Sequence, residues 1–313
     1  MNMINVTPGF SPAARMPRAI TTRGGGVIIT ARDESGVSLD EIARRAPAVF
    51  AEEAHESRSA RYVYTDTREV LGGLLAEGFR IEEVRQGGSR IAGKANFTKH
   101  AIRLSAPAAQ VVETRPGDRS RPQVVLRNAH DGTSSYQLRS GVYRFLCLNG
   151  MVTGEDFEDF RVGHVRGARD KIIDAAFRVV EQFPQAVDAI RSMDGLSLSG
   201  GEQHAFATAA LALRWEPEEL ADGGTRAAPI QADQLNRVRR PGDAGDSLWL
   251  TMNRVQEGLI RGGQRYLHVT GEGRNRRVQN RSVGAVNSID QDSKINRALW
   301  TLADEMRKLK AAA

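Results

Sequence analysis

The segment Gln123–Gly150, QVVLRNAHDGTSSYQLRSGVYRFLCLNG, decides the fold of this chain. Apolar and polar residues alternate on both sides of Asp131–Gly132, a dipeptide that favours a tight hairpin turn. This pattern predicts two antiparallel strands, each with one buried face and one polar face. We therefore expect the hairpin to lie in the centre of a sheet. The residues expected to be buried on the return strand are Tyr136, Leu138, Val142 and Leu146.

The same hairpin carries two motifs, RNAHDGTS at Arg127–Ser134 and GVYRFLCLNG at Gly141–Gly150. Both resemble a family of phage- and plasmid-borne proteins known only as a domain of unknown function. Further segments that resemble this family are Leu248–Asn253, Gln256–Glu257, Gly262–Gly263 and Asn296–Trp300. The resemblance extends from Val27 to the C-terminus. It implies no particular chemistry, because the family has no settled activity.

The periodicity of apolar residues changes along the chain. Up to Gly150, candidate strands outnumber helices and short loops join several of them, which favours an antiparallel sheet with one or two helices. After Phe160, apolar residues recur at helical spacing. The sequence therefore predicts an α+β fold with a helical C-terminal half. The expected parts are a flexible tail at residues 1–26, an antiparallel sheet domain at 27–160 and a helical region at 161–313.

The composition of the 313 residues is that of a globular protein with a net charge of +6. This positive balance suggests an anionic partner. The single cysteine, Cys147, excludes disulfides within the chain and predicts a cytoplasmic protein; it is expected to be a small buried hydrophobe rather than a catalytic thiol. No apolar run approaches the roughly 18 residues that span a membrane. Motifs for nucleotides, dinucleotides and zinc are absent from the sequence, so no cofactor is expected.

Positive charge is concentrated in Arg261–Arg281, which holds six arginines and one carboxylate, Glu272. Glycines in this segment predict a flexible basic loop. Arginine interleaved with glycine and an aromatic ring, Tyr266, is typical of a surface that follows a nucleic-acid backbone and stacks on bases. The alternative is an ordinary solvated loop.

A second basic set is expected on the polar face of the sheet. If Arg127 and Arg139 share a solvated face, they form an electropositive strip with Lys94 and Lys99 nearby, which could hold an extended strand by phosphate contacts. The alternative is ordinary alternation with the polar side outward. The residues predicted to contact nucleic acid in the two sets are Arg127, Arg139, Arg144, Arg261, Arg265, Tyr266, Arg274, Arg276, Arg277 and Arg281.

Catalytic residues are harder to assign. His130–Asp131 could be a general base with its orienting acid, but an Asx turn that closes the hairpin is favoured. Asp290, Asp292 and Asp156, with Glu155, could bind a divalent metal, yet they lack ligand spacing and are better explained as caps and solvated carboxylates. In an enzyme, Asp131 and the late aspartates would be the metal ligands. An enzyme is therefore the less favoured class.

These observations predict a nucleic-acid-binding protein of phage or plasmid type. The expected outline of hairpin sheet, helices and basic groove is similar to that of phage single-strand annealing proteins, which suggests single-stranded DNA binding in recombination. One alternative is a metal-dependent nuclease or nucleotide hydrolase. Another is a scaffold or inhibitor that binds a host protein. A stripe on the last helix would dock on the domain or on a second copy in a homo-oligomer, and it comprises Ile295, Leu299, Leu302, Met306 and Leu309.

Overall fold

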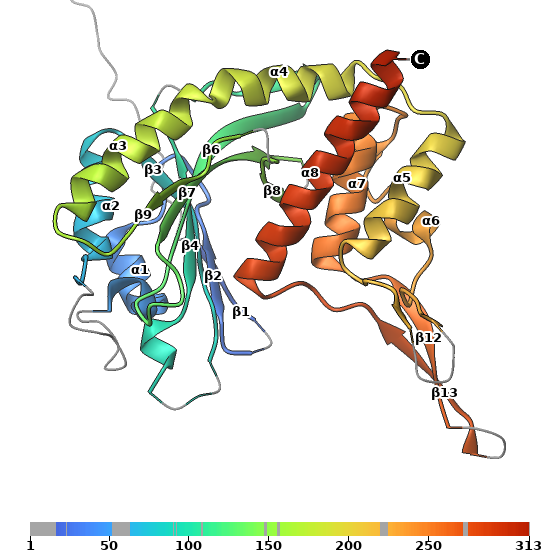
Figure 1. Ribbon diagram of the computed structural model, residues 1–313, viewed down its shortest axis with the longest axis horizontal. Helices are drawn as coiled ribbons and strands as arrows, with labels where there is room; N and C mark the ends of the chain where they lie inside the picture. The colour runs from blue at the N-terminus through green and yellow to red at the C-terminus, as the bar shows by residue number, and fades with distance from the viewer. Residues whose placement is uncertain are drawn as a thin grey trace, which may run out of the picture.

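The computed structural model describes residues 17–22, 24–51, 63–89, 91, 93–107, 109–146, 149–154, 157–219, 225–271 and 275–312. A large twisted sheet forms one half of the molecule and a group of helices forms the other (Figure 1). A two-stranded hairpin projects from the helical half. The expectations for the tail at Met1–Met16, for Cys147 and for Arg274 lie outside the described residues.

The large sheet follows the order β1-β2-β3-β4-β6-β7-β8, with β5 on β6 and β9 on β7. All of its pairings are antiparallel. Its strands are β1 (Arg18–Thr21), β2 (Val27–Thr30), β3 (Arg80–Gln86), β4 (His100–Ser105), β5 (Val112–Arg115), β6 (Asp118–Asn128), β7 (Tyr136–Arg144), β8 (Asn149–Val152) and β9 (Phe160–Val162).

Eight α-helices accompany the sheet in the described residues. They are α1 (Leu39–Arg45), α2 (Thr67–Ala76), α3 (Ala168–Glu181), α4 (Phe183–Asp194), α5 (Gly200–Ala212), α6 (Ala232–Leu235), α7 (Leu248–Arg261) and α8 (Ile289–Ala312). Short 3₁₀ turns occur at Pro47–Phe50, Ala95–Phe97 and Pro241–Asp243. Two small hairpins complete the fold: β10 (Glu218–Glu219) with β11 (Thr225–Arg226), and β12 (Arg265–Thr270) with β13 (Arg277–Ser282). The predicted α+β class with a helical C-terminal part is confirmed.

The β6–β7 hairpin is the centre of the sheet, as its alternation predicts. Tyr136, Leu138 and Val142 are fully buried, whereas Leu146 lies partly exposed in the turn after β7. The expectation of a flexible tail up to residue 26 was wrong for Arg18–Thr21, which pairs with β2. The polar stretch after Ala106 contains β5, which turns back on β6 through Gly117 at φ 83°.

The first of two hydrophobic cores lies between the sheet and α1–α3. Val124 and Leu126 of β6 and Tyr136 and Leu138 of β7 face it, because these residues share one parity of their strands. From the C-terminal half, α3 contributes apolar residues at helical spacing, and they are Ile172, Ala175, Ala176 and Val179. The sheet is therefore closed on this face by helices from both parts of the sequence.

The second core is built around α7, every residue of which is buried from Leu248 to Ile260. Helix α8 packs along it and buries Ile295, Leu299 and Trp300. The predicted stripe on α8 is therefore buried at its start, but Leu309 near its end is 68% exposed. None of the helices in the described ranges has the length and apolar character that a membrane crossing requires.

Candidate nucleic-acid interface

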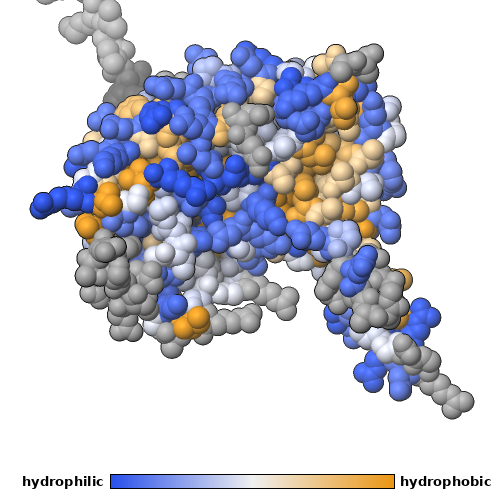
Figure 2. Space-filling model, in the orientation of Figure 1, coloured by the Kyte–Doolittle hydropathy of each residue, from blue (hydrophilic) through white to orange (hydrophobic). Residues whose placement is uncertain are grey.

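The Arg261–Arg281 segment forms a projecting β-hairpin rather than the flexible loop that its glycines predict. Strands β12 and β13 pair over their whole length, from Arg265 opposite Ser282 to Thr270 opposite Arg277. We call these two strands, with the described residues of the turn between them, the arm; it extends beyond the body of the molecule in Figure 1, and its visible surface in Figure 2 is mainly hydrophilic. Of the six arginines, Arg274 is outside the described residues.

Pairing gives the arm two distinct faces, because residues directly opposite each other on antiparallel strands point to the same side. The basic face comprises Tyr266, His268, Thr270, Arg277, Gln279 and Arg281. Its rings lie close together, with the Tyr266 and His268 centroids 6.4 Å apart in an edge-on arrangement. The opposite face carries the aliphatic side chains, and its residues are Arg265, Leu267, Val269, Val278, Asn280 and Ser282. Leu267 is 69% exposed, so the described residues leave the aliphatic face largely uncovered.

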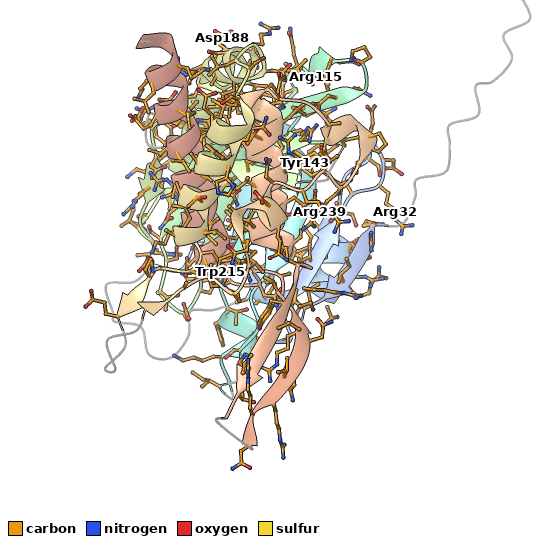
Figure 3. The ribbon with its side chains drawn as sticks, turned by 90° about the vertical axis from the view of Figure 1, so that its right-hand side faces the viewer. Arg32, Arg115, Tyr143, Asp188, Trp215 and Arg239 are labelled. Carbon is orange, nitrogen blue, oxygen red and sulfur yellow. The ribbon has the colours of Figure 1, made fainter. Side chains whose placement is uncertain are left out.

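The base of the arm is held firmly. Gly262 and Gly263 turn the chain out of α7 with φ angles of 66° and 89°, a region that favours glycine. A Cβ on Gly262 would lie 2.4 Å from the carbonyl oxygen of Val283, so a larger residue would push the two strands apart. The guanidinium of Arg239, labelled in Figure 3, donates to the carbonyl of Gly262 at 2.8 Å. These contacts therefore fix the direction in which the arm leaves α7.

The arginines of the arm are available to an anionic partner. Arg265, Arg276, Arg277 and Arg281 are exposed, and within the described ranges the first three form no ion pair. Arg281 donates to its neighbour Gln279 at 2.8 Å, which leaves its charge uncompensated by that contact. The arm is thus a two-stranded ribbon with unneutralised cations beside two aromatic rings.

The sheet arginines behave differently, and the expectation of a solvated basic strip was wrong. Arg127 and Arg139 do share one face of β6–β7, but each is only 6% exposed. The first turn of α8 covers this face, so that Arg127 pairs with Asp290. Arg139 pairs with Asp159 at 2.8 Å.

Further contacts in this layer tie α8 to the sheet. Lys99 donates to Asp290 at 2.6 Å, and Arg85 donates to Asp292 at 2.8 Å. Burial alone raises the pKa of Asp290, but the hydrogen bonds and charges of Lys99 and Arg127 outweigh it and lower that pKa below its ordinary value. The arginines of this face are therefore counter-ions to carboxylates of the same chain.

Arg144, predicted to contact nucleic acid, is fully buried. Its guanidinium makes a two-pronged contact with Asp118, at 2.6 Å and 2.9 Å, and donates to Asp243 at 2.6 Å. Asp243 also accepts from Arg240 at 3.0 Å. This network joins β6 and β7 to the turn before α7 and leaves Arg144 no surface for a ligand, so its predicted role is corrected to a structural one.

His130–Asp131 does not form a catalytic pair. The Asp131 carboxylate accepts from the Thr133 amide at 3.0 Å and from its hydroxyl at 2.6 Å, which is the favoured Asx turn. His130 turns inward instead and shares a hydrogen bond with the Thr67 hydroxyl at 3.0 Å.

Three histidines meet behind this turn, an arrangement that sequence reasoning missed. The ring centroids of His100 and His130 are 5.4 Å apart, and those of His130 and His164 are 6.5 Å apart. Burial lowers the pKa of His100 to about 3 and that of His130 to about 4. The residues come from β4, the β6–β7 turn and the loop after β9, so no spacing in the sequence could reveal the cluster.

Of the carboxylates named for a metal site, Glu155 and Asp156 lie outside the described residues, and the others are engaged elsewhere. Asp290 and Asp292 neutralise basic side chains of the sheet, and Asp131 closes its turn. Among the residues that the structure describes, no group of three or more His, Cys, Asp and Glu side chains is arranged to hold a metal ion.

The fold and the site define an α+β protein with a nine-stranded antiparallel sheet, a helical half and a projecting basic arm. The chain belongs to the DUF932 family, a domain of unknown function, whose model matches residues 54–300. It is similar to two proteins of Escherichia coli (strain K12), UPF0380 protein YafZ and UPF0380 protein YfjQ. Each is 35% identical over 287 residues, which cover 92% of this chain and 97% of the relative. No solved structure matches the chain. The family suggested by the hairpin motifs is thereby confirmed.

Proposed function

We propose that this chain is a nucleic-acid-binding protein of phage or plasmid type that holds a single strand on its arm. The observation that carries the proposal is the basic face of the arm, where Arg277 and Arg281 flank Tyr266 and His268. Cations that follow a backbone, with rings on which bases stack, are the two elements of single-strand binding without sequence preference.

The buried sheet arginines support the choice of the arm. In the body, most arginines near the sheet face have a carboxylate within ion-pair distance, as Arg85, Arg127 and Arg139 do. A cation that is already paired with a carboxylate releases little free energy on meeting a phosphate. The arm arginines lack such partners in the described ranges and are exposed, so they are the groups from which phosphate contacts release counter-ions.

Mechanistically, the arm would bind the strand without making or breaking a covalent bond. Arginines would hold the phosphates, and Tyr266 or His268 would stack on a base. Other bases would remain free to pair with a second strand, which is the requirement for annealing in recombination. The single cysteine agrees with work in the reducing cytoplasm.

The test is equilibrium binding of labelled oligonucleotides to three forms of the chain. The arm variant carries Arg276→Ala, Arg277→Ala and Arg281→Ala. The control carries Arg166→Ala, Arg169→Ala and Lys171→Ala, which remove the same charge from exposed positions in and just before α3, on the opposite side of the molecule from the arm.

At low salt we expect the intact chain and the control to bind, and the arm variant to bind at least tenfold more weakly, to the same extent for all sequences. An intact chain that binds no oligonucleotide at low salt would remove the proposal. In that case the metal-dependent nuclease and the host-protein scaffold would be examined next. Equal affinity of the arm variant and the intact chain would place the interface elsewhere on the molecule.

A further inference from the structure

A cleft of ≈570 Å³ opens at the root of the arm, between the outer edge of the sheet and the end of α7. One wall is formed by β1 and β2, through Arg18, Ile20 and Ile28. The other is formed by Ile260 and Arg261 before the arm and by residues 285–287 after it. Figure 3 shows Arg32 beside β1 and β2, on the side of the molecule from which the arm descends.

The cleft is strongly cationic. Four arginines line it, Arg18, Arg32, Arg85 and Arg261, against a single carboxylate, Glu83. Arg85 is already engaged, because it donates to Glu83 at 2.6 Å and to Asp292 at 2.8 Å. Arg18 and Arg32 are exposed and have no ion pair within the described part of the chain. Two uncompensated guanidinium groups therefore face the cleft.

The cleft also has an apolar wall. Ile20 and Ile28 are directly paired across β1 and β2, so they present adjacent aliphatic surface on one face. Ile20 is 45% exposed, so its aliphatic surface is open to the cleft. Tyr143 and Val286 are among the other apolar residues that line the cleft. Guanidinium groups beside an apolar wall suit a ligand that has an anionic end and an aromatic body.

From these features we propose that the cleft binds one nucleotide unit, with its phosphate on Arg18 and Arg32 and its base against Ile20, Ile28 and Tyr143. The volume falls within the range of roughly 300–1,000 Å³ that is common for small-ligand sites. Guanidinium groups bind phosphate oxygens through paired hydrogen bonds. A lone inorganic anion would leave the apolar wall exposed, so the base is part of the recognition.

The position of the cleft links it to the arm. Arg261 is four residues before β12, and Val286 is four residues after β13. A strand that lies on the arm would therefore reach the cleft at the arm's root. The nucleotide unit can come from such a strand or from a free nucleotide; the strand as its source rests on the proposed function, whereas the chemistry of the cleft does not.

A neighbouring hollow of ≈300 Å³ continues the path along the sheet. It shares Thr30, Arg32, Glu83 and Tyr143 with the first. At its far side, the guanidinium groups of Arg119 and Arg121 lie 5.6 Å and 5.3 Å from the ring centroid of Phe145. Its charges are more nearly balanced, since Asp33, Glu34 and Glu82 also line it. The cationic subsite is therefore the first hollow.

The experiment compares the intact chain with Arg18→Ala/Arg32→Ala, with the lysine double variant Arg18→Lys/Arg32→Lys, and with the control Arg166→Ala/Arg169→Ala. Each is titrated with thymidine monophosphate, with inorganic phosphate and with a labelled oligothymidine. Circular dichroism verifies that each variant is folded.

We expect thymidine monophosphate to bind more tightly than inorganic phosphate to the intact chain. The alanine pair should lower the affinity for the mononucleotide about tenfold or more, because a charge-assisted hydrogen bond is lost. The lysine pair should recover part of this affinity. The control should match the intact chain. If the strand occupies the cleft, the alanine pair also weakens oligothymidine; an effect on the mononucleotide alone identifies a free nucleotide as the ligand.

Mononucleotide binding that is undetectable, or that is equal in the alanine pair and the intact chain, overturns the proposal. Its failure is distinct from failure of the arm. When the mononucleotide test fails in this way, oligothymidine binding that depends on Arg276, Arg277 and Arg281 removes the cleft and leaves the arm. Mononucleotide binding that depends on Arg18 and Arg32, with oligothymidine binding that does not depend on Arg276, Arg277 and Arg281, leaves a nucleotide site and removes the arm.

Discussion

Replacing Arg144 by methionine removes the cation from a fully buried ion-pair network and puts an unbranched apolar side chain in its place. Arg144 is 0% exposed, and its partners Asp118 and Asp243 are each 2% exposed. Asp243 keeps its contact with Arg240 at 3.0 Å. Asp118 keeps no ion pair among the described residues, because both of its carboxylate oxygens are held by Arg144.

Removal of one member of a buried pair costs about 3–5 kcal/mol, because the remaining charge stays buried without compensation. This loss is large beside a typical unfolding free energy of about 5–15 kcal/mol. We expect Arg144→Met to lower the unfolding free energy by that amount, as measured by urea denaturation. Arg161→Met, an exposed arginine on β9, is the matched control and should change it by less than about 0.5 kcal/mol.

The double variant Arg144→Met/Asp118→Asn removes both charges and should recover at least about 1 kcal/mol of the loss. A loss for Arg144→Met below about 1 kcal/mol would contradict the structural role, and it would return Arg144 to the candidates for ligand binding. A full loss with no recovery in the double variant would mean that packing, and not charge, accounts for the effect.

Two further predictions concern the histidine cluster and α8. Because the pKa values of His100 and His130 lie at about 3 and about 4 in the folded chain, below about 6.5 for unfolded histidine, the unfolded state takes up protons first as the pH falls. The unfolding free energy should therefore decrease by roughly 1.4 kcal/mol per pH unit for each histidine as the pH falls from about 6 to about 4. The His100→Gln variant should lose the contribution of one histidine to this slope. Equal slopes for the variant and the intact chain would contradict the linkage. Trp300→Ala should cost about 3–5 kcal/mol, whereas Leu309→Ala, at an exposed position, should change stability little. If Leu309→Ala instead dissolves an oligomer in sedimentation experiments, the exposed end of α8 is an assembly surface.

Local patterns predicted the faces of the central hairpin, because alternation along a strand directly assigns each residue to a side. Tyr136 and Leu138 are buried as this parity requires, and Arg127 and Arg139 share the other side. What the pattern could not reveal is the cover over that second side. One of the acids that neutralise these arginines is Asp290, which lies more than 150 residues away in the sequence. Only the tertiary fold brings it to this face of the sheet.

Two elements are hard to predict for local reasons. The alternation of Tyr266 and His268 with Leu267 and Val269 is that of a strand, but the surrounding glycines and arginines favour a loop. Helix α4 is not evident from the sequence, because Pro184 follows the apolar residues of α3 and is typical of a helix end. Proline is also well tolerated in the first turn, where its missing amide would have no intrahelical partner, and α4 begins at Phe183.

The salt dependence of oligonucleotide binding tests the central claim most directly. If about four arginines of the arm contact phosphates of a single strand, the slope of log affinity against log salt should be near −3, from roughly −0.7 for each contact. The variant Arg276→Ala/Arg277→Ala/Arg281→Ala should flatten this slope by about two, since it removes three contacts. The α3 control should keep the slope of the intact chain. An arm variant with the slope and affinity of the intact chain would contradict the account.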